Sequence, residues 1–332
     1  MRHFSTWWSL RVLTVLAALV SLTVIAACGS SGTGSHSGSS SSGGLEKTHL
    51  TVGALAVADD APLYLAIKDG FFKQAGLTVT AVPVAQSTEA IPDMLRGSVD
   101  VIAGANYVSF FQAEAKGVVS FKVLADATHC TAGTFEVMAL PGSGITTPAS
   151  LAGKTVATNL TGNVQTLTLG AVLKADGTNP SSVHYVVVPF PDMVAALKAH
   201  RVDAISTIEP YITASQQQLG AVPVVSQCTG PAASFPMSGY FSTASWAQQN
   251  PNTAKAFIRA LDKAQALADS DPSAVRAILP TYTQITSKTA DALKLNTYPA
   301  ALSAAPLQQV SSLMLSGGLL SKPLSVTPLL FP

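Results

Sequence analysis

Hydrophobic and polar positions follow patterns that predict short strands separated by helices along most of the chain. Residues 49–55 alternate between apolar and polar, as a strand does, and 61–75 are apolar at helical spacing before Gly76. Further strands are expected at 77–84, 99–103 and 118–125, with helices at 87–95 and 107–115. Strands that alternate with helices of this length indicate parallel βαβ units.

The same pattern then recurs, which predicts a second α/β unit. Strands are expected at 155–158, 183–188, 203–206 and 222–225, separated by helices at 164–175, 192–199 and 210–219. Residues 96–102 also align with 199–205, because each stretch ends a helix and enters a strand with Val-Asp-x-Ile. This match indicates two similar lobes, although coincidence between two βαβ units stays an alternative. From 244 to 317 the chain is largely helical.

Composition narrows the class of protein. The 332 residues include 19 basic and 18 acidic side chains, and charged residues make up 11% of the chain, below the usual figure of about 25%. This balance excludes a nucleic-acid binder that relies on a strong positive field. Three cysteines exclude a dense disulfide scaffold and a four-cysteine zinc site. No Walker loop or Gly-x-Gly-x-x-Gly fingerprint is present. We expect no cofactor, and no metal, because only two of the usual three or four ligands are visible at His129 and Cys130.

The N-terminus has the features of an export signal. Arg2 and Arg11 precede an uncharged stretch at 12–27, which is short for a stable transmembrane helix. The stretch ends in Ile-Ala-Ala before Cys28, which resembles the bacterial lipobox. In lipobox proteins this cysteine is lipidated and becomes the first mature residue, so we predict a lipoprotein signal peptide at 1–27. An ordinary signal or a membrane anchor with an incidental cysteine is the alternative.

A tether is expected after the signal. Residues 29–44 contain only Ser and Gly apart from Thr33 and His36, and such a stretch cannot bury enough apolar area to offset its ordering entropy. We predict that 28–47 is a flexible tether that holds a folded body outside the bacterial cell membrane. In that oxidising compartment Cys130 and Cys228 most simply pair. Two free buried thiols, or a metal site with His129 and Cys130, are the alternatives.

Four motifs in order resemble the substrate-binding proteins of ABC importers, in the family that serves nitrate, sulfonates, taurine and thiamine pyrimidine precursors. Residues 61–72 are similar to its Pro-x-x-x-Ala-x-x-x-Gly-Phe-Phe helix, and 95–100 to its Leu–Gly–Asp step. Residues 151–157 resemble its Leu-x-Gly-Lys-x-Val-Ala entry to the second lobe, and 209–211 its acid-Pro-Tyr element. The resemblance covers 48–300.

The resemblance implies an α/β fold of the periplasmic-binding-protein type 2 class, with a helical C-terminal tail. Two lobes joined by two crossover segments would divide the body, lobe 1 at 48–134 and 236–332 and lobe 2 at 135–235. Because the crossovers run side by side in this fold, a Cys130–Cys228 disulfide would staple the hinge. The implied partners are a small-molecule ligand and a membrane permease with its ATPase. A monomer is expected, anchored to the membrane by lipid on Cys28 and with no nucleic-acid partner.

Candidate ligand-binding residues follow the strand ends, because open α/β sheets bind ligands there. They are Asp59, Asp60, Ser87, Asn106, Tyr107, Thr161, Gly162, Asn163 and Glu209. No Lys or Arg falls in these loops, so the acids favour a nitrogenous ligand such as an amine or amidine. The turn at 161–163 precedes a helix and could instead face a sulfonate. Glu209 is the strongest single candidate.

Purely structural roles for the same residues stay open. Ser, Asn and Thr are common helix caps, and the two acids could cap a helix in solvent. We expect Glu209→Ala and Asn106→Ala each to weaken ligand binding without unfolding the protein.

Two other functions compete with solute delivery to an importer. One is a lipid-anchored sensor or partner-presenting protein of the same fold. The other is an enzyme related to those of menaquinone or pyrimidine biosynthesis. The iron-dependent pyrimidine synthase would require a Cys-rich motif and clustered His, which this chain lacks. We therefore predict that the protein is not an enzyme.

Overall fold

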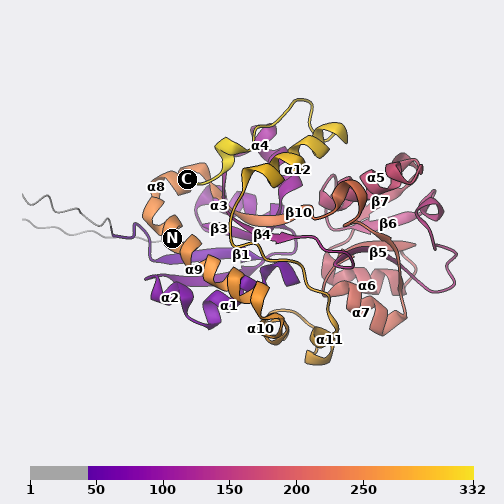
Figure 1. The fold of residues 1–332 in the computed structure, drawn as a ribbon, viewed down its shortest axis with the longest axis horizontal. Coiled ribbons are helices and arrows are strands. Elements are labelled where there is room, and N and C mark those ends of the chain that lie inside the picture. Colours follow the sequence, from indigo (N-terminus) through magenta and orange to yellow (C-terminus); the bar gives the residue numbers. More distant parts are fainter. Residues whose placement is uncertain (1–43) are drawn as a thin grey trace, which may run out of the picture. The chain divides into compact units, whose positions relative to one another are not determined.

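The computed structural model describes residues 44–332, so the predicted signal peptide, Cys28 and most of the predicted tether lie outside the described residues. The first of two sheets has the strand order β2-β1-β3-β10-β4 (Figure 1). Strand β1 runs parallel to β2 and β3, whereas β10 is antiparallel to β3 and β4. These strands are β1 (His49–Ala54), β2 (Thr78–Pro83), β3 (Val101–Asn106), β4 (Phe121–His129) and β10 (Pro236–Thr243).

The second sheet repeats this arrangement. Its order is β7-β6-β8-β5-β9, with β6 parallel to β7 and β8 and with β5 antiparallel to β8 and β9. Its strands are β5 (Phe135–Ala139), β6 (Thr155–Thr158), β7 (His184–Val187), β8 (Ala204–Ile208) and β9 (Val222–Ser226). The chain leaves the first sheet between β4 and β5 and returns between β9 and β10. This topology confirms the predicted two-lobed α/β fold.

Helices cover both sheets. We call the first sheet with α1–α4 and α8–α12 lobe 1, and the second sheet with α5–α7 lobe 2. The helices of lobe 1 are α1 (Ala61–Lys68), α2 (Phe71–Gln74), α3 (Ile91–Arg96), α4 (Tyr107–Ala115), α8 (Ala244–Gln249), α9 (Pro251–Ser270), α10 (Pro272–Ile278), α11 (Ser287–Ala292) and α12 (Ala304–Ser316). Those of lobe 2 are α5 (Val164–Ala175), α6 (Phe190–Lys198) and α7 (Tyr211–Leu219). The predicted boundaries at 134/135 and 235/236 fall where β5 and β10 begin.

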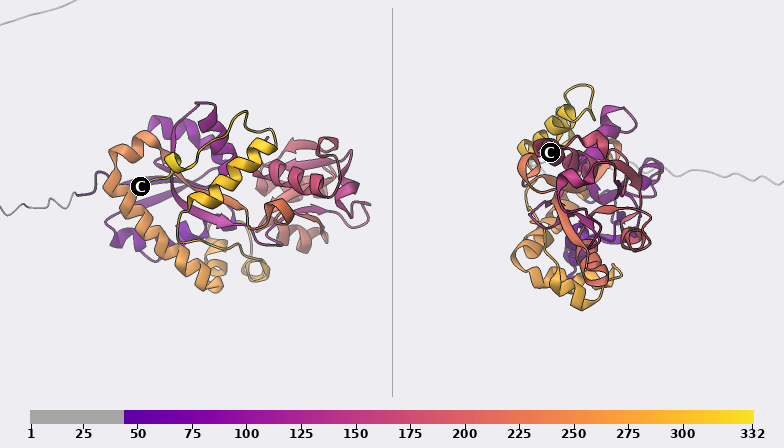
Figure 2. Two further views of the ribbon diagram at one scale, coloured as in Figure 1. Left: turned by 45° about the horizontal axis from the view of Figure 1, so that its top comes forward. Right: turned by 90° about the vertical axis from the view of Figure 1, so that its right-hand side faces the viewer.

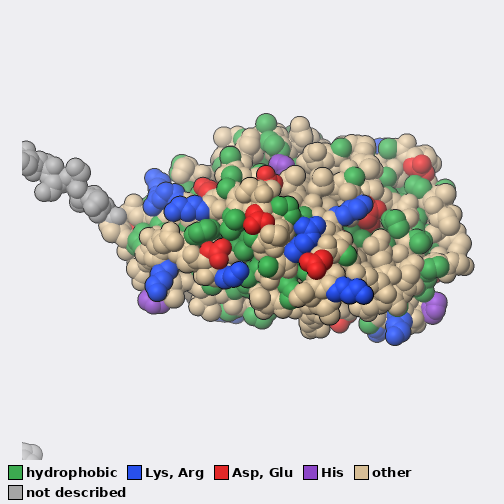
Figure 3. Space-filling view, turned by 60° about the horizontal axis from the view of Figure 1, so that its bottom comes forward, with side chains coloured by type: hydrophobic (Ala, Val, Ile, Leu, Met, Phe, Trp, Pro, Cys, Tyr) green, Lys and Arg blue, Asp and Glu red, His purple; other side chains and the backbone are tan. Residues whose placement is uncertain are grey.

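The C-terminal tail returns to lobe 1. Helix α9 lies against α1 and α2, and α12 lies against α4 (Figure 2). Aromatic pairs fasten the tail, since Phe72 stacks on Phe257 with ring centroids 5.0 Å apart and Tyr64 stacks on Tyr282 at 3.8 Å. Among the helices from residue 44 onward, none combines the length and apolar character needed to cross a bilayer. On the face shown in Figure 3, side chains of both charge signs are scattered.

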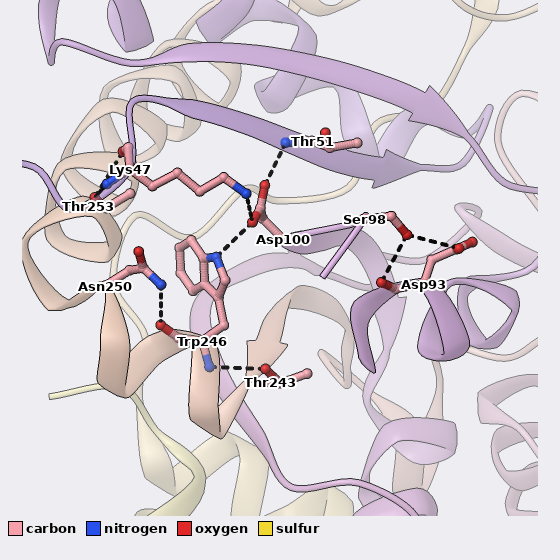
Figure 4. Close-up of polar contacts among 9 residues, drawn as sticks. All are labelled: Lys47, Thr51, Asp93, Ser98, Asp100, Thr243, Trp246, Asn250 and Thr253. Carbon is pink, nitrogen blue, oxygen red and sulfur yellow. Dashed lines mark hydrogen bonds and ion pairs between the residues drawn. The ribbon is translucent and has the colours of Figure 1, made fainter. Parts of the chain in front are cut away.

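A buried acid joins the start of the described chain to the tail. Asp100 accepts hydrogen bonds from Lys47 Nζ at 2.6 Å and Trp246 Nε1 at 2.8 Å, and from the Thr51 amide at 2.9 Å (Figure 4). Thr253 in α9 also bonds the Lys47 backbone in both directions at 3.0 Å. Residues 44–47, the end of the predicted tether, therefore contact α9.

Candidate functional site

A small cavity of about 30 Å³ lies between the two lobes. Lobe 1 lines it with residues from the loops after β1 and β2, from the end of β3 and from β10. Lobe 2 lines it from the start of β5, the end of β8 and the starts of α5 and α6. The lining residues are Leu55, Val57, Asp59, Ser87, Gly104, Asn106, Phe135, Asn159, Val164, Gln165, Phe190, Ile208, Met237 and Ser238.

Asp59 supplies the charge of this cavity. Its carboxylate is 3% exposed and accepts hydrogen bonds from Thr128 Oγ1 and Ser238 Oγ, each at 2.7 Å, and from Asn296 Nδ2 at 3.0 Å. Burial raises the pKa of Asp59, and these three donors oppose that rise by stabilising the carboxylate. Since a carboxylate can accept about four hydrogen bonds, Asp59 keeps the capacity to accept one more from a ligand.

Asp60 lies behind the cavity rather than on its surface. It is fully buried, and its Oδ2 accepts a hydrogen bond from the Leu55 amide at 2.6 Å. Burial, and secondly the charge of Asp59, raises the pKa of Asp60 well above its ordinary value. The cavity residue Gly104 has a φ of +57°, and a Cβ there would overlap the Asp60 carboxylate. Glycine at 104 therefore allows β3 to approach the buried acid closely.

Ser87 and Asn106 form a polar edge on the same wall. Asn106 Oδ1 accepts a hydrogen bond from the Ser109 amide at 2.9 Å and so caps α4, while its Nδ2 donates to Ser87 Oγ at 3.4 Å. Asn106 is therefore both a cap and a cavity residue. Ser87 is buried in the turn that precedes α3, and its side chain caps no helix.

The wall contributed by lobe 2 is a network of neutral amides. Gln165 Oε1 accepts from the Asn159 amide at 2.8 Å and from Asn163 Nδ2, and Gln165 Nε2 donates to the Ser206 carbonyl. Asn163 also donates to Asn159 Oδ1 at 2.7 Å and caps α5 through the Thr166 amide at 3.2 Å. Asn159 and Gln165 face the cavity, and Asn163 supports them from behind.

The remaining predicted site residues are not among those that line the cavity. Tyr107 is fully buried in lobe 1, where its hydroxyl donates to Asp126 Oδ1 at 2.9 Å. Thr161 lines a separate surface hollow beside α4. Gly162 accepts a hydrogen bond at its carbonyl from Gln112 Nε2 of α4, which links the two lobes.

Glu209 is turned away from the cavity, although its neighbour Ile208 lines it. Its carboxylate accepts from Thr213 Oγ1 at 2.8 Å, from the Thr213 amide at 3.1 Å and from the Lys294 amide at 3.3 Å. Burial raises the pKa of Glu209 to about 7, and those hydrogen bonds and the Lys294 charge act in the opposite direction.

Several cavity residues were missed from the sequence. Phe135, Met237 and Ser238 belong to β5 and β10, two strands that the apolar patterns did not reveal. Gln165 is the second residue of α5, and an amide side chain at that position does not by itself indicate a binding site. Phe190, the first residue of α6, stacks on Tyr211 with ring centroids 6.0 Å apart.

Cys130 and Cys228 are paired in the structure, with Cα atoms 5.6 Å apart, inside the usual range of about 4.4–6.8 Å. They lie in the two segments that connect the lobes. Within 44–332, no group of three or more His, Cys, Asp or Glu side chains is arranged to hold a metal ion.

Two sheets of this order, joined by two crossings and enclosing a cavity between them, define a periplasmic-binding-protein type 2 fold. The family model described as NMT1/THI5 like matches residues 58–275. The chain belongs to this family.

The chain is similar to named proteins in sequence and in fold. The chain is 25% identical over 244 residues to the nitrate/nitrite binding protein NrtA of Nostoc sp., which is 68% of this chain and 55% of that protein. The chain thus matches about half the length of that relative. The alkanesulfonate-binding protein SsuA of Xanthomonas axonopodis pv. citri, solved with MOPS bound, has a TM-score of 0.74 at 19% identity, covering 86% of this chain and 99% of that one. The desulfurization enzyme DSZB has a TM-score of 0.63 at 18% identity, covering 86% and 97%.

Proposed function

We propose that the protein is the extracytoplasmic solute-binding component of an ABC importer. The observation that carries this proposal is a largely apolar cavity with a few polar side chains, whose walls come from both lobes. A solute that contacts both walls at once stabilises the closed arrangement, and only a solute with such differential contacts can shift the equilibrium between open and closed forms. Membership of the NMT1/THI5-like family and the nitrate-binding relative support the same role.

The solute is a small organic molecule with at least one N–H donor, such as an amine, an amidine or an aminoheterocycle. Asp59 is the charged residue among those lining the cavity, and the described lining includes no Lys, Arg or His. A bare anion would meet this carboxylate without a cation to offset it, which is unfavourable in a buried site. Apolar side chains such as Phe190 and Met237 would contact a hydrocarbon or ring portion. A zwitterionic aminosulfonate, with its ammonium at Asp59, is the sulfonate-type alternative.

The closed protein would deliver its solute to a membrane permease that a partner ATPase drives. We propose that it acts as a monomer, anchored by lipid on Cys28 outside the bacterial cell membrane. The Cys130–Cys228 disulfide would staple the two connecting segments. Mass spectrometry of a non-reduced digest tests it, because free thiols at both positions would contradict the staple.

We infer that the protein binds without catalysing a reaction. Support comes from the buried acids, which are engaged by fixed donors rather than arranged as an acid and a base around a nucleophile. A sensor or partner-presenting protein of the same fold would bind a solute equally well. The genes beside this one separate the two roles, since an importer component is expected next to a permease and an ATPase.

Thermal unfolding in the presence of defined probes tests the solute class. The panel consists of aminopyrimidines, polyamines, flavins, taurine, MOPS, alkanesulfonates and nitrate. A probe at 100 times its Kd stabilises the native protein by about 2.7 kcal/mol, which shifts the melting temperature by several degrees. Stabilisation by an aminopyrimidine or polyamine supports the proposal. Stabilisation by nitrate or an alkanesulfonate alone would contradict the nitrogenous class while leaving solute capture intact.

A further inference from the structure

Lobe 2 holds the cavity loop of lobe 1 through the turn that follows β8. The Ala58 amide donates to the Glu209 carbonyl at 3.1 Å, and the Tyr211 hydroxyl donates to the Ala56 carbonyl at 2.9 Å. Both lobe 1 residues lie in the loop after β1, which places Leu55, Val57 and Asp59 in the cavity. The turn therefore contacts the backbone of the loop that carries the cavity's carboxylate.

The tail of lobe 1 secures this junction from the other side. Its Lys294 amide donates to Glu209 Oε1, so Glu209 contacts lobe 1 through both its backbone and its side chain. Tyr282 and Tyr298, also from the tail, donate to the carbonyls of Val57 at 2.9 Å and Ala58 at 3.0 Å. Three consecutive carbonyls, 56–58, are thus each held by a tyrosine hydroxyl, one of them from lobe 2.

This junction lies beside the hinge. The Thr297 carbonyl, three residues after Lys294, accepts from the His129 amide at 3.2 Å, next to the connecting segment that begins at Cys130. Helices α7 and α11 continue the junction outward through Thr289 Oγ1, which donates to Gln217 Oε1 at 2.8 Å (Figure 1).

The opposite side of the cavity is joined differently. Gln112 of α4 donates to the Gly162 carbonyl, and Gly317 after α12 approaches Leu167 of α5 so closely that a Cβ would lie 2.8 Å from the leucine Cδ1. Apolar packing and one hydrogen bond constrain the two lobes less than a set of directional hydrogen bonds with a buried acid at its centre.

We propose that Glu209 and Tyr211 form a hinge-side brace, defined as residues 56–58, 209–211 and 294, which sets the angle between the lobes and positions the loop carrying Asp59. Both are positioning residues that bind lobe 1 rather than the solute. The inference rests on the proposed function, because a brace on lobe angle matters only for a protein that captures solute by closing.

Distance measurement between spin labels tests the brace without any added solute. The labels are attached to cysteines introduced by Lys116→Cys at the end of α4 and Asp176→Cys at the end of α5, two exposed positions. The background is Cys28→Ser, in which Cys130 and Cys228 are paired. Tyr211→Phe removes the hydroxyl that reaches Ala56 and keeps the ring stacked on Phe190. Tyr185→Phe is the matched control, since the Tyr185 hydroxyl is buried with no hydrogen-bond partner among the described residues.

We expect the closed, short-distance fraction to fall at least threefold in Tyr211→Phe and in Glu209→Ala. It should stay unchanged in Tyr185→Phe and be largely restored in Glu209→Gln, which keeps an acceptor for the Lys294 amide. Two distances in the parent protein with unchanged fractions in Tyr211→Phe would overturn the brace and leave solute capture standing. A single distance in the parent and every variant would overturn lobe closure itself, and the brace with it. Because Tyr211→Phe alters one atom, the test holds even if Glu209→Ala fails to fold.

Discussion

The two lobes share one frame but offer different walls to the cavity between them. In lobe 1 the Asp100 amide donates to the Thr51 carbonyl at 2.9 Å, and the Thr51 amide donates back to Asp100 Oδ2 at 2.9 Å. In lobe 2 Asp203 and Thr155 make the same pair of bonds, at 2.9 and 2.8 Å. The Val-Asp-x-Ile match in the sequence therefore marks equivalent strand entries in two sheets of the same order.

The two lobes differ at the carboxyl ends of their strands, where the loops face the cavity. Lobe 1 presents the Asp59 carboxylate with hydroxyl groups around it, whereas lobe 2 presents a neutral amide network centred on Gln165. A repeated sheet brings two sets of loops face to face, and the loop residues then decide the chemistry. We infer that the acidic wall selects the charge of the solute and that the amide wall orients it.

The largest expected effect comes from removing the charge of lobe 1. Asp59→Ala leaves three buried donors without their acceptor, so we expect the free energy of unfolding to fall by about 3–5 kcal/mol. Affinity for the best nitrogenous probe should fall at least 100-fold, measured by titration calorimetry. Asp59→Asn preserves the shape and isolates the loss of charge.

The matched change in lobe 2 sharpens the comparison. Gln165→Ala also breaks a buried network, yet it removes no charge, so affinity for the same probe should fall less than tenfold. Equal losses of affinity in Asp59→Asn and Gln165→Ala would contradict the division between a selecting wall and an orienting wall.

The next effect separates the two equivalent aspartates. Asp100 is buried and also engages Lys47 and Trp246, so Asp100→Ala should lower the free energy of unfolding by about 2–3 kcal/mol. Asp203 is exposed and bonds the Thr155 amide, so Asp203→Ala should cost less than about 1 kcal/mol. Chemical denaturation of both variants measures the difference. Equal losses of unfolding free energy in the two variants would mean that the Lys47 and Trp246 contacts add nothing to stability.

An effect of similar size, which depends on pH, arises where lobe 2 contacts lobe 1. Because burial raises the pKa of Glu209 from its ordinary 4.5 to about 7, the folded protein keeps a proton there that the unfolded chain releases. The contribution of Glu209 to stability is therefore greatest below pH 4.5 and declines as the pH rises to about 7. We expect this decline to reach about 3 kcal/mol.

Glu209→Gln isolates that decline, since Asp59 and Asp60 also have raised pKa values and titrate in the same direction in both proteins. The stability difference between the parent and Glu209→Gln should change between pH 4.5 and 7 and level off above pH 7. A difference that stays flat across this window would show that Glu209 titrates normally.

The sequence predicts the frame better than the site for identifiable physical reasons. Strands flanked by amphipathic helices leave a readable pattern, but β5 and β10 are buried throughout, so they show no alternation of apolar and polar residues, and they pair with strands distant in the chain. Their cavity residues Phe135, Met237 and Ser238 were missed for that reason.

Adjacent residues in a turn also point in different directions, which the sequence does not reveal. Asp59 lines the cavity while Asp60 faces β3, and Ile208 lines it while Glu209 faces Lys294. The place of Asn106 in the cavity was predictable from the sequence. It ends β3 and caps α4, so the helix that follows fixes the position of its side chain.

Asn106→Ala has the smallest expected effect, and it tests whether one residue serves both as a cap and as a cavity contact. Loss of a cap costs about 1 kcal/mol of stability, and Thr243→Ala, which removes the cap of α8 outside the cavity lining, is the matched control. Both variants should lose similar stability, whereas only Asn106→Ala should weaken binding of the nitrogenous probe, by five- to tenfold. If neither variant changed the affinity, Asn106 would be a cap alone, and the selectivity of lobe 1 would depend on Asp59 and its hydroxyl neighbours.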